Sequence, residues 1–515
     1  MRARRGRQKK EETVRPKQTA SQTDGVEYRR AKTWQIALTM MSNSLSMTFY
    51  TLIGYMSYLA NVGYGIALAA AGVILTVTRL FDGVIDPFLA LLMDRVNTKH
   101  GKLRLFMVAG WLLRTLAVLL LFVWLSDTGR GPVLFVILYC LYIIGASTCD
   151  IAGNMAAAVI TNDPQQRPMV GVWGTVYAYL VPTILSALIV MCVLPRFGNE
   201  YTAQMLSATA LIVVPVSLVF LVLTCVGISE ADKPQNFENV SAAGDDAGVT
   251  VADMWRLVKA NRPFQMYVLH CVSSKLSQQT MSQAIVTTVV FGILIGNIQY
   301  GTMISIVAML PSIVFAIVAG KFCGKVGSKK IAVFAMLAGI AVTVVMVIFC
   351  AAIDMASIAG FSVQMIVFFI LILIINGLKM CITTADNAMR SDVIDYELSR
   401  SGKYLPAVVN ATYNVIDQVI SSLGSTIAAV CISFVGYAST TPQPTDPSTP
   451  ALKAMGLFLY FGLPVLGWLI GLFAMKHYDL GRARMVEVQK DIADKRAALH
   501  HSEAAADSDE TAKEA

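Results

Sequence analysis

Long apolar stretches separated by short polar segments dominate the pattern along the chain. A helix that crosses the ~30 Å hydrocarbon core of a bilayer needs about 20 mostly apolar residues. Twelve stretches of that kind are present: 34–58, 66–93, 105–126, 132–160, 169–195, 204–229, 264–293, 300–320, 330–352, 359–386, 405–437 and 452–475. Each stretch is continuous, whereas barrel strands would alternate over about 10 residues, so the pattern predicts an all-α membrane protein with twelve transmembrane helices.

A polar stretch at 230–263 divides the twelve predicted spans into two sets of six. Short, basic, glycine-containing loops follow the second span at 94–104 and the eighth span at 320–330. Such loops are expected at any cytoplasmic turn, but together with the central linker they favour a duplicated chain. We therefore expect an N-terminal half at 34–229, a cytoplasmic linker at 230–263 and a C-terminal half at 264–475. Secondary transporters are built from repeated halves around a midplane site.

Composition and charge agree with this class. Hydrophobic residues make up 56% of the 515 positions and charged residues 14%, where an average soluble chain has about 25% charged. Most Lys and Arg residues lie in the tails and in the loops that follow even-numbered spans. The positive-inside rule then places both termini in the cytoplasm, with a basic tail at 1–33 and a second tail at 476–515. The net charge of +8 reflects this topology and predicts no nucleic-acid partner.

Two carboxylates one helical turn apart, Asp82 and Asp86, interrupt the second apolar stretch. A carboxylate at the bilayer centre costs at least about 2.5 kcal/mol, so such residues point to a partner or a function. Asp82 has a structural alternative, an ion pair with Arg79 on the same helical face. Asp86 has no basic residue at helical spacing, which favours a cation site.

Three separated motifs carry a family resemblance: the segment 79–87 with its basic loop, the segment 161–167 after the fourth span, and the segment 391–403 after the tenth. Together they resemble the melibiose permease-like glycoside-pentoside-hexuronide:cation symporters of the major facilitator superfamily. The resemblance covers about residues 34–480 and implies the major facilitator fold with two six-helix halves.

The resemblance also implies a cation site between the second and fourth spans, formed by Asp82, Asp86, Ser147 and Asp150. Helical spacing places each pair on one face, so the two spans offer oxygen donors to one small cation. Na⁺ and H⁺ are both suitable coupling ions, because oxygen donors bind Na⁺ and buried carboxylates also take up protons. Ile85 stands where the melibiose permeases have an asparagine, which leaves selectivity for Na⁺ open. No other cofactor is expected.

Other residues stand in this chain where the family has its sugar contacts. Ser44 lies near the position of an acid in the first span, and Asn154 replaces a tryptophan in the fourth. Thr175 lies near the position of an arginine in the fifth span, and Ser421 replaces a lysine in the eleventh. Melibiose-type specificity is therefore not carried over. Basic residues within spans, Arg114, Lys275 and Lys379, either line a cavity for an anionic or zwitterionic solute or pair with Asp150, Asp386 and Asp417.

Aromatic residues are further candidates for substrate contact. These are Trp173, Tyr177, Tyr179 and Tyr413. The predicted substrate-binding set is Ser44, Asn154, Trp173, Thr175, Lys275, Lys379, Tyr413 and Ser421. His270, at the start of a span, is expected to be interfacial.

Charged residues of the inner loops are predicted to act as gates. Asp94, Arg95, Asp392, Asp395 and Glu397 lie near helix ends, where opposite charges pair only when the bundle is closed on that side.

The sequence thus predicts a monomeric, multi-pass transporter of the cell membrane that couples entry of Na⁺ or H⁺ to uptake of a sugar, glycoside or related organic anion by alternating access. One alternative keeps the fold but carries a lysolipid-like or other zwitterionic solute. A second, less favoured alternative is a non-transporting solute sensor. No nucleophile–base arrangement, metal-ligand spacing or phosphate loop points to an enzyme.

Overall fold

A computed structural model describes residues 21–23, 26–28, 30–96, 101–126, 131–161, 166–233, 251–401, 406–492 and 494–495. Two short strands, β1 (Ser21–Thr23) and β2 (Val26–Tyr28), pair antiparallel before the first predicted span. The predicted fold class holds for the rest of the described chain, which is helical apart from its turns and loops. The strands lie within the tail at 1–33, and the first helix begins at Thr33.

Each of the twelve predicted ranges coincides with a helix or a run of consecutive helices. In the N-terminal half these are α2 (Thr33–Thr39), α3 (Met41–Ile53), α4 (Met56–Tyr58), η1 (Leu59–Gly63), α5 (Leu68–Arg95), α6 (Leu103–Leu119), η2 (Leu120–Trp124), α7 (Gly131–Val159), α8 (Arg167–Leu188), η3 (Ile189–Val193), η4 (Leu194–Phe197) and α9 (Ala203–Ile228). The central linker contributes α11 (Val251–Ala260). In the C-terminal half they are α12 (Arg262–Met281), α13 (Ala284–Thr287), η5 (Thr288–Leu294), α14 (Gln299–Val326), α15 (Ser328–Ala352), η6 (Met355–Ala359), α16 (Val363–Ser401), α17 (Pro406–Ser433), α18 (Pro450–Leu457), η7 (Phe458–Gly462) and α19 (Leu463–Lys476). Residues 482–492 are also helical.

Several helix starts have a polar capping residue followed by proline or an apolar turn. Thr202 accepts a hydrogen bond from the amide of Met205 at the start of α9. Asn261 does the same for Phe264 at the start of α12, and Thr449 for Leu452 at the start of α18. These side chains satisfy amides that have no partner within the helix, which fixes where the spans begin.

Within the described residues, eight helices are long and apolar enough to cross a membrane. The consecutive segments Ala284–Leu294 and Gln299–Ala308 would form a ninth span together, but they are bent by 111° at the break between them. The first predicted span does not pass as one helix because it is divided at Met40 and Gly54 into short helices. On α5, the charged side chains Arg79, Asp82 and Asp86 are partly buried, where a charge costs less than in lipid.

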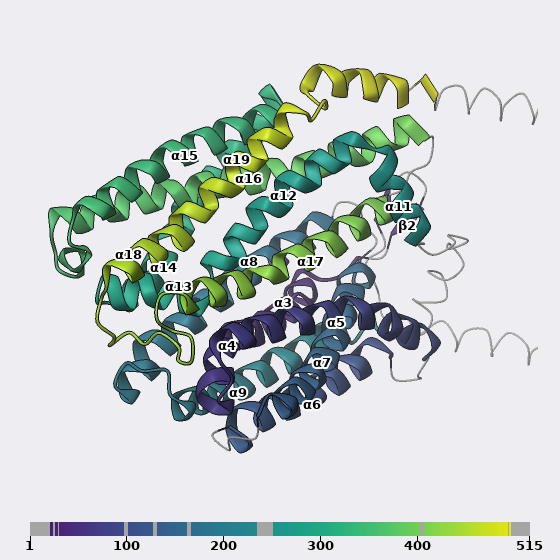
Figure 1. The fold of residues 1–515 in the computed structure, drawn as a ribbon. Helices are drawn as coiled ribbons and strands as arrows, with labels where there is room; N and C mark the ends of the chain where they lie inside the picture. The colour runs from purple at the N-terminus through teal and green to yellow at the C-terminus, as the bar shows by residue number, and fades with distance from the viewer. Residues whose placement is uncertain are drawn as a thin grey trace, which may run out of the picture.

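The helices form two groups. Figure 1 shows α3, α5, α6, α7 and α9 gathered on one side, and α12, α14, α15, α16 and α19 on the other. The two groups meet where α5 packs against α17 and where α8 packs against α14. At Gly72 of α5 an added Cβ atom would lie 2.7 Å from the Cβ atom of Ala429, so the absence of a side chain allows the close approach of α17.

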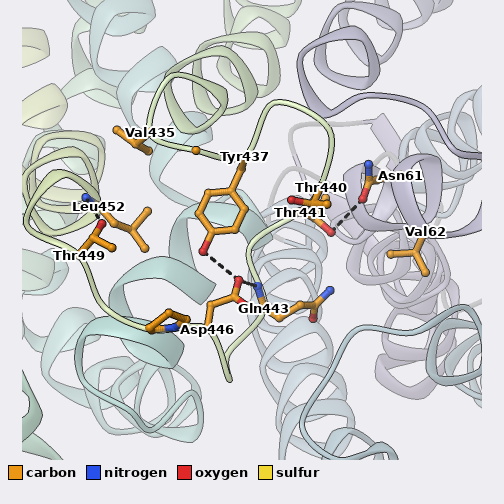
Figure 2. Close-up of a pocket in the computed structure, with 12 residues that line it drawn as sticks. Asn61, Val62, Val435, Tyr437, Thr440, Thr441, Gln443, Asp446, Thr449 and Leu452 are labelled. Carbon is orange, nitrogen blue, oxygen red and sulfur yellow. Dashed lines mark hydrogen bonds between the residues drawn. The ribbon is translucent and has the colours of Figure 1, made fainter.

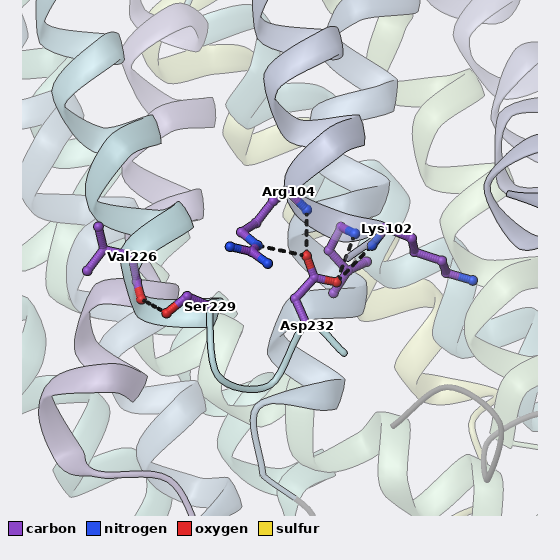
Figure 3. A network of polar contacts seen from close by, with 6 residues as sticks. Lys102, Arg104, Val226, Ser229 and Asp232 are labelled. Carbon is purple, nitrogen blue, oxygen red and sulfur yellow. Dashed lines mark hydrogen bonds and ion pairs between the residues drawn. The ribbon is translucent and has the colours of Figure 1, made fainter. Parts of the chain in front are cut away.

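The start of α6 is fixed by a carboxylate from the end of α9 (Figure 3). Asp232 accepts hydrogen bonds from the backbone amides of Lys102, Leu103 and Arg104 at 3.0, 3.1 and 3.0 Å, and from Nε of Arg104 at 3.2 Å. An anion at a helix N-terminus satisfies free amides and complements the helix dipole. Asp232 therefore ties the turn between α5 and α6 to the last span of the same half.

A long loop at 434–449 joins α17 to α18 and reaches the N-terminal half. Asn61 donates a hydrogen bond to the carbonyl of Ser439 at 2.8 Å, and Tyr58 donates to the carbonyl of Pro442 at 2.8 Å. Figure 2 shows Asn61 and Thr441 facing each other beside a pocket of about 570 Å³, in which Tyr437 points to Asp446. The two halves are thus joined at the end of the bundle that the sequence predicts to be extracellular.

Candidate functional site

The two carboxylates of the second span lie on α5, at the boundary between the halves. Helical spacing places Arg79, Asp82 and Asp86 along one face, and that helix packs against α7 of its own half and α17 of the other. All three side chains are partly buried. The face that carries them is therefore turned toward protein.

Both oxygens of Asp82 are held by neutral donors. The hydroxyl of Ser147 on α7 donates to Oδ1, and Nε2 of Gln418 on α17 donates to Oδ2 at 2.9 Å. The contact with Ser147 was expected from the sequence, whereas Gln418 comes from the opposite half and was not anticipated.

A third carboxylate lies nearby. Asp150 of α7 accepts a hydrogen bond from the hydroxyl of Ser46 on α3, and it is close enough to Asp82 and Asp86 for electrostatic interaction. Ser46 is another residue that the sequence did not single out. Within the described residues, Oδ1 of Asp86 is buried without a hydrogen-bond partner. Three carboxylates and two hydroxyls from α3, α5 and α7 therefore converge on one region.

These donors suit a small, hard cation. Carboxylate and hydroxyl oxygens are the ligands that hard cations prefer, and a cation would also offset the repulsion between three nearby carboxylates. A proton shared among the carboxylates would relieve the same repulsion. Asp86, with its unpartnered oxygen, is the acid best placed to gain a ligand.

The structural alternative for Asp82, an ion pair with Arg79, is not formed. Among the described residues, Arg79 makes no ion pair with any carboxylate. Its side chain instead interacts with Tyr139 of α7.

The lysines and arginine that the sequence placed within spans, Arg114, Lys275 and Lys379, likewise form no ion pair within the described part of the chain. Arg114 is buried, donates to the hydroxyl of Tyr142 at 2.9 Å and lies 4.3 Å from the ring centroid of Phe49. The Nζ atom of Lys379 lies 3.1 Å from the sulfur of Met281. Lys275 is within electrostatic reach of Asp417. Arg114 is thus held by aromatic groups and is also within electrostatic reach of Asp150.

The remaining predicted substrate contacts differ in burial and in partners. Ser44 and Ser421 are buried, Asn154 is exposed and Trp173 stacks on Tyr177 at 5.5 Å. The side chain of Thr175 lies outside the described residues. Tyr413 lies 4.1 Å beneath the guanidinium of Arg390, which also donates to the hydroxyl of Tyr267 at 3.0 Å. Arg390 is a basic residue of the bundle that the sequence analysis did not single out.

His270 differs from the expectation of an interfacial residue. It is completely buried, and its Nε2 atom lies 2.8 Å from Oδ1 of Asp386. Cys271 brings a sulfur atom near the same pair, with ligand atoms all within 4.8 Å of one another. Packing of α12, α16 and α19 buries His270. Its position near the start of a span did not indicate this burial.

Of the predicted gating residues, the side chains of Asp94 and Arg95 lie outside the described part of the structure. Asp392 faces Ser328. Asp395 accepts a hydrogen bond from Gln489 at 2.7 Å.

Glu397 is buried and binds Asn261 at 2.7 Å and Arg400 at 2.9 Å. Nearby, Ser399 and Lys495 donate to Asp491, and these hydrogen bonds lower the pKa of that carboxyl below its ordinary value. All these described contacts stay within the linker, the C-terminal half and the C-terminal tail.

Comparison with known proteins identifies the class. The profile of the MFS/sugar transport protein family matches residues 35–482. A protein of Escherichia coli strain K12 named as a glycoside/cation symporter, YagG, is 22% identical over 444 residues, which are 84% of this chain and 89% of that protein. The symporter YjmB of Bacillus subtilis strain 168 is 23% identical, over 82% of this chain and 87% of its own length.

Solved structures show the same fold at low identity. A mutant of the nucleoside transporter NupG gives a TM-score of 0.59 at 13% identity and covers 87% of this chain and 99% of that one. An inward-facing bacterial homologue of the lysosomal transporter Spinster gives 0.56 at 12% identity, covering 90% and 99%. The profile match spans nearly all of the predicted transmembrane region, and the chain belongs to the MFS/sugar transport protein family of multi-pass membrane transporters.

Proposed function

We propose that this secondary transporter is a symporter, in which entry of Na⁺ or H⁺ drives uptake of a sugar, glycoside or related organic anion. The observation that supports it best is the convergence of Asp82, Asp86 and Asp150 with two hydroxyl groups at the boundary between the halves. Three neighbouring carboxylates that form no direct ion pair within the described residues are expensive in a membrane unless a cation binds there. The relative named as a glycoside/cation symporter supports the same activity.

Alternating access follows from the way the halves meet. The described hydrogen bonds between halves lie at mid-depth, as between Asp82 and Gln418, or at the end that holds the loop at 434–449. The contacts of that loop join the halves at the predicted outer end. Transport then requires these contacts to break while new ones form at the opposite end, where we place Asp94, Arg95, Asp392, Asp395 and Glu397 as gates.

The cation and solute are coupled through binding to the same state. A cation neutralises the carboxylate cluster and so favours the conformation in which the solute also binds, and linkage requires the solute to strengthen cation binding by the same factor. Candidate solute contacts remain Ser44, Asn154, Trp173, Thr175, Lys275, Lys379, Tyr413 and Ser421. We place the protein in the cell membrane as a monomer, with both termini and the linker at 230–263 in the cytoplasm.

Uptake into sealed vesicles tests this proposal. An imposed inward gradient of Na⁺, or separately of H⁺, should drive accumulation of at least one member of a panel of glycosides, uronides and organic anions above its external concentration. An ionophore that dissipates the driving gradient should abolish accumulation and leave passive equilibration intact. Equal uptake with and without either gradient would contradict symport.

A further inference from the structure

A cavity of about 80 Å³ lies between the two halves, one helical turn from the cation site. Its polar lining comes from Tyr50, Arg79 and Tyr139 of the N-terminal half and from Gln279, Ser282, Gln283 and Ser425 of the C-terminal half. The hydroxyl of Tyr50 donates to Oε1 of Gln279 at 3.3 Å, so the two halves touch across it. Any group bound there contacts both halves at once.

Arg79 is the one formally charged residue among the described residues that line this cavity. Its guanidinium is close enough to Asp82, three residues away, for electrostatic interaction, but within the described residues it forms no ion pair with that carboxylate. The oxygens of Asp82 instead accept hydrogen bonds from Ser147 and Gln418. A partly buried guanidinium that makes no direct contact with an acid is costly, which makes an anion in the cavity a favourable partner.

We propose that this cavity binds an anionic group, a carboxylate, of the transported solute, with Arg79 as its main ligand. The inference rests on the proposed symport function and assigns part of its solute site. A guanidinium recognises a planar carboxylate through paired charge-assisted hydrogen bonds. The side-chain amide group of Gln279 supplies a further donor on the opposite wall, since its oxygen is occupied by Tyr50.

The size of the cavity limits what it holds. Pockets for whole small molecules measure about 300–1,000 Å³, so a cavity of about 80 Å³ fits one polar end of a solute. The rest of the molecule must lie outside it, along the boundary between the halves.

The position beside Asp82 gives a physical basis for coupling. Three residues of helix correspond to a rise of about 4.5 Å, so a cation at the carboxylate cluster and an anion at Arg79 attract each other across one turn of α5. Each ligand therefore lowers the free energy of binding the other, which is the thermodynamic requirement for symport.

Matched solutes that differ only in the acid group test the assignment. Gradient-driven uptake is measured for p-nitrophenyl glucuronide against p-nitrophenyl glucoside, and for the corresponding galacturonide and galactoside, in wild type, Arg79→Gln, Arg79→Lys and the control Arg196→Gln. Arg196 is exposed at the opposite end of the N-terminal half from the linker. We expect wild type to prefer an acid over its neutral partner by about tenfold or more, the loss expected for a hydrogen bond to a charged group.

Arg79→Gln should lose that preference, Arg79→Lys should keep part of it, and Arg196→Gln should retain it in full. Detergent-solubilised protein must elute as a single species for each variant, and partial rescue by lysine separates recognition from misfolding. Gradient-driven uptake of the neutral members alone, or an acid preference unchanged in Arg79→Gln, would overturn the inference while leaving symport intact. No gradient-driven uptake of any member would count against the proposed function itself.

Discussion

Gln418 of the C-terminal half donates a hydrogen bond from Nε2 to Oδ2 of Asp82 in the N-terminal half, with 2.9 Å between the two atoms. The bond joins the proposed cation site to a helix that must move when the halves rock. Occupation of the site and the relative position of the halves are thereby linked through one pair of side chains.

Replacing Gln418 with leucine should weaken cation binding. Asp82 would lose a hydrogen bond worth about 1.5–3 kcal/mol, and its carboxylate would no longer be held in one orientation. We expect the Na⁺ or H⁺ concentration for half-maximal uptake to rise about tenfold. Gln265→Leu is the matched control, because that amide binds the carbonyl of Val258 at 2.6 Å, away from the site. An unchanged cation dependence in Gln418→Leu would show that the bond plays no part in coupling.

Closure of the predicted outer end should depend on the contact between Asn61 and the loop at 434–449. In a cysteine-free background, Asn61→Cys with Thr441→Cys places two thiols where the hydroxyl of Thr441 now donates to the side-chain oxygen of Asn61 at 3.3 Å. Oxidation should stop uptake by locking that end closed, and reduction should restore it. Each single variant should be insensitive to oxidant; full activity of the cross-linked double variant would exclude this loop from the gating movement.

Gly72→Ala should push α5 away from α17. The new Cβ atom would meet the Cβ atom of Ala429 at 2.7 Å and the carbonyl oxygen of Ser425 at 3.0 Å, so the closed packing cannot be retained without a shift. A cysteine introduced at Thr76, buried against Ser422, should then react faster with an impermeant maleimide. Gly360→Ala has no atom within 4 Å of its new Cβ and should leave labelling unchanged. Slower labelling in Gly72→Ala would argue against tight packing here.

Asp232→Ala should reduce stability rather than specificity. The substitution removes the acceptor for three backbone amides at the start of α6, for which we expect a loss of about 2 kcal/mol. Thermal unfolding in detergent measures it. Asp354→Ala is a suitable comparison, since that carboxylate accepts one amide hydrogen bond, from Ala356 at 3.2 Å. Similar unfolding temperatures for the two variants would mean that the cap contributes little.

The twelve helical ranges followed from hydropathy because each apolar run is long enough to cross a bilayer, and the structure has a helix or run of helices in every one. Breaks inside them were not predicted. The division of the first span at Met40 and Gly54, for example, depends on how the chain packs against its neighbours.

At the site, the family resemblance placed Asp82 and Ser147 on facing spans, and the two side chains are in contact. Ser46 and Gln418 were missed because a serine or glutamine within a span usually satisfies its own backbone or packs against a neighbour. Their partners depend on how α3 and α17 are rotated, which periodicity does not encode. His270 was placed at the interface for the same reason, since its partner Asp386 lies 116 positions away in the chain.

The central claim, that a cation bound beside Asp86 drives transport, is tested most directly by comparing solute accumulation in vesicles carrying wild type, Asp86→Ala or Asp479→Ala under an imposed Na⁺ or H⁺ gradient. Asp479 is exposed after the last span and serves as the control. We predict that Asp86→Ala loses gradient-driven accumulation at normal protein levels but still equilibrates the solute, while Asp479→Ala behaves as wild type. Accumulation in Asp86→Ala as steep as in wild type would contradict the claim.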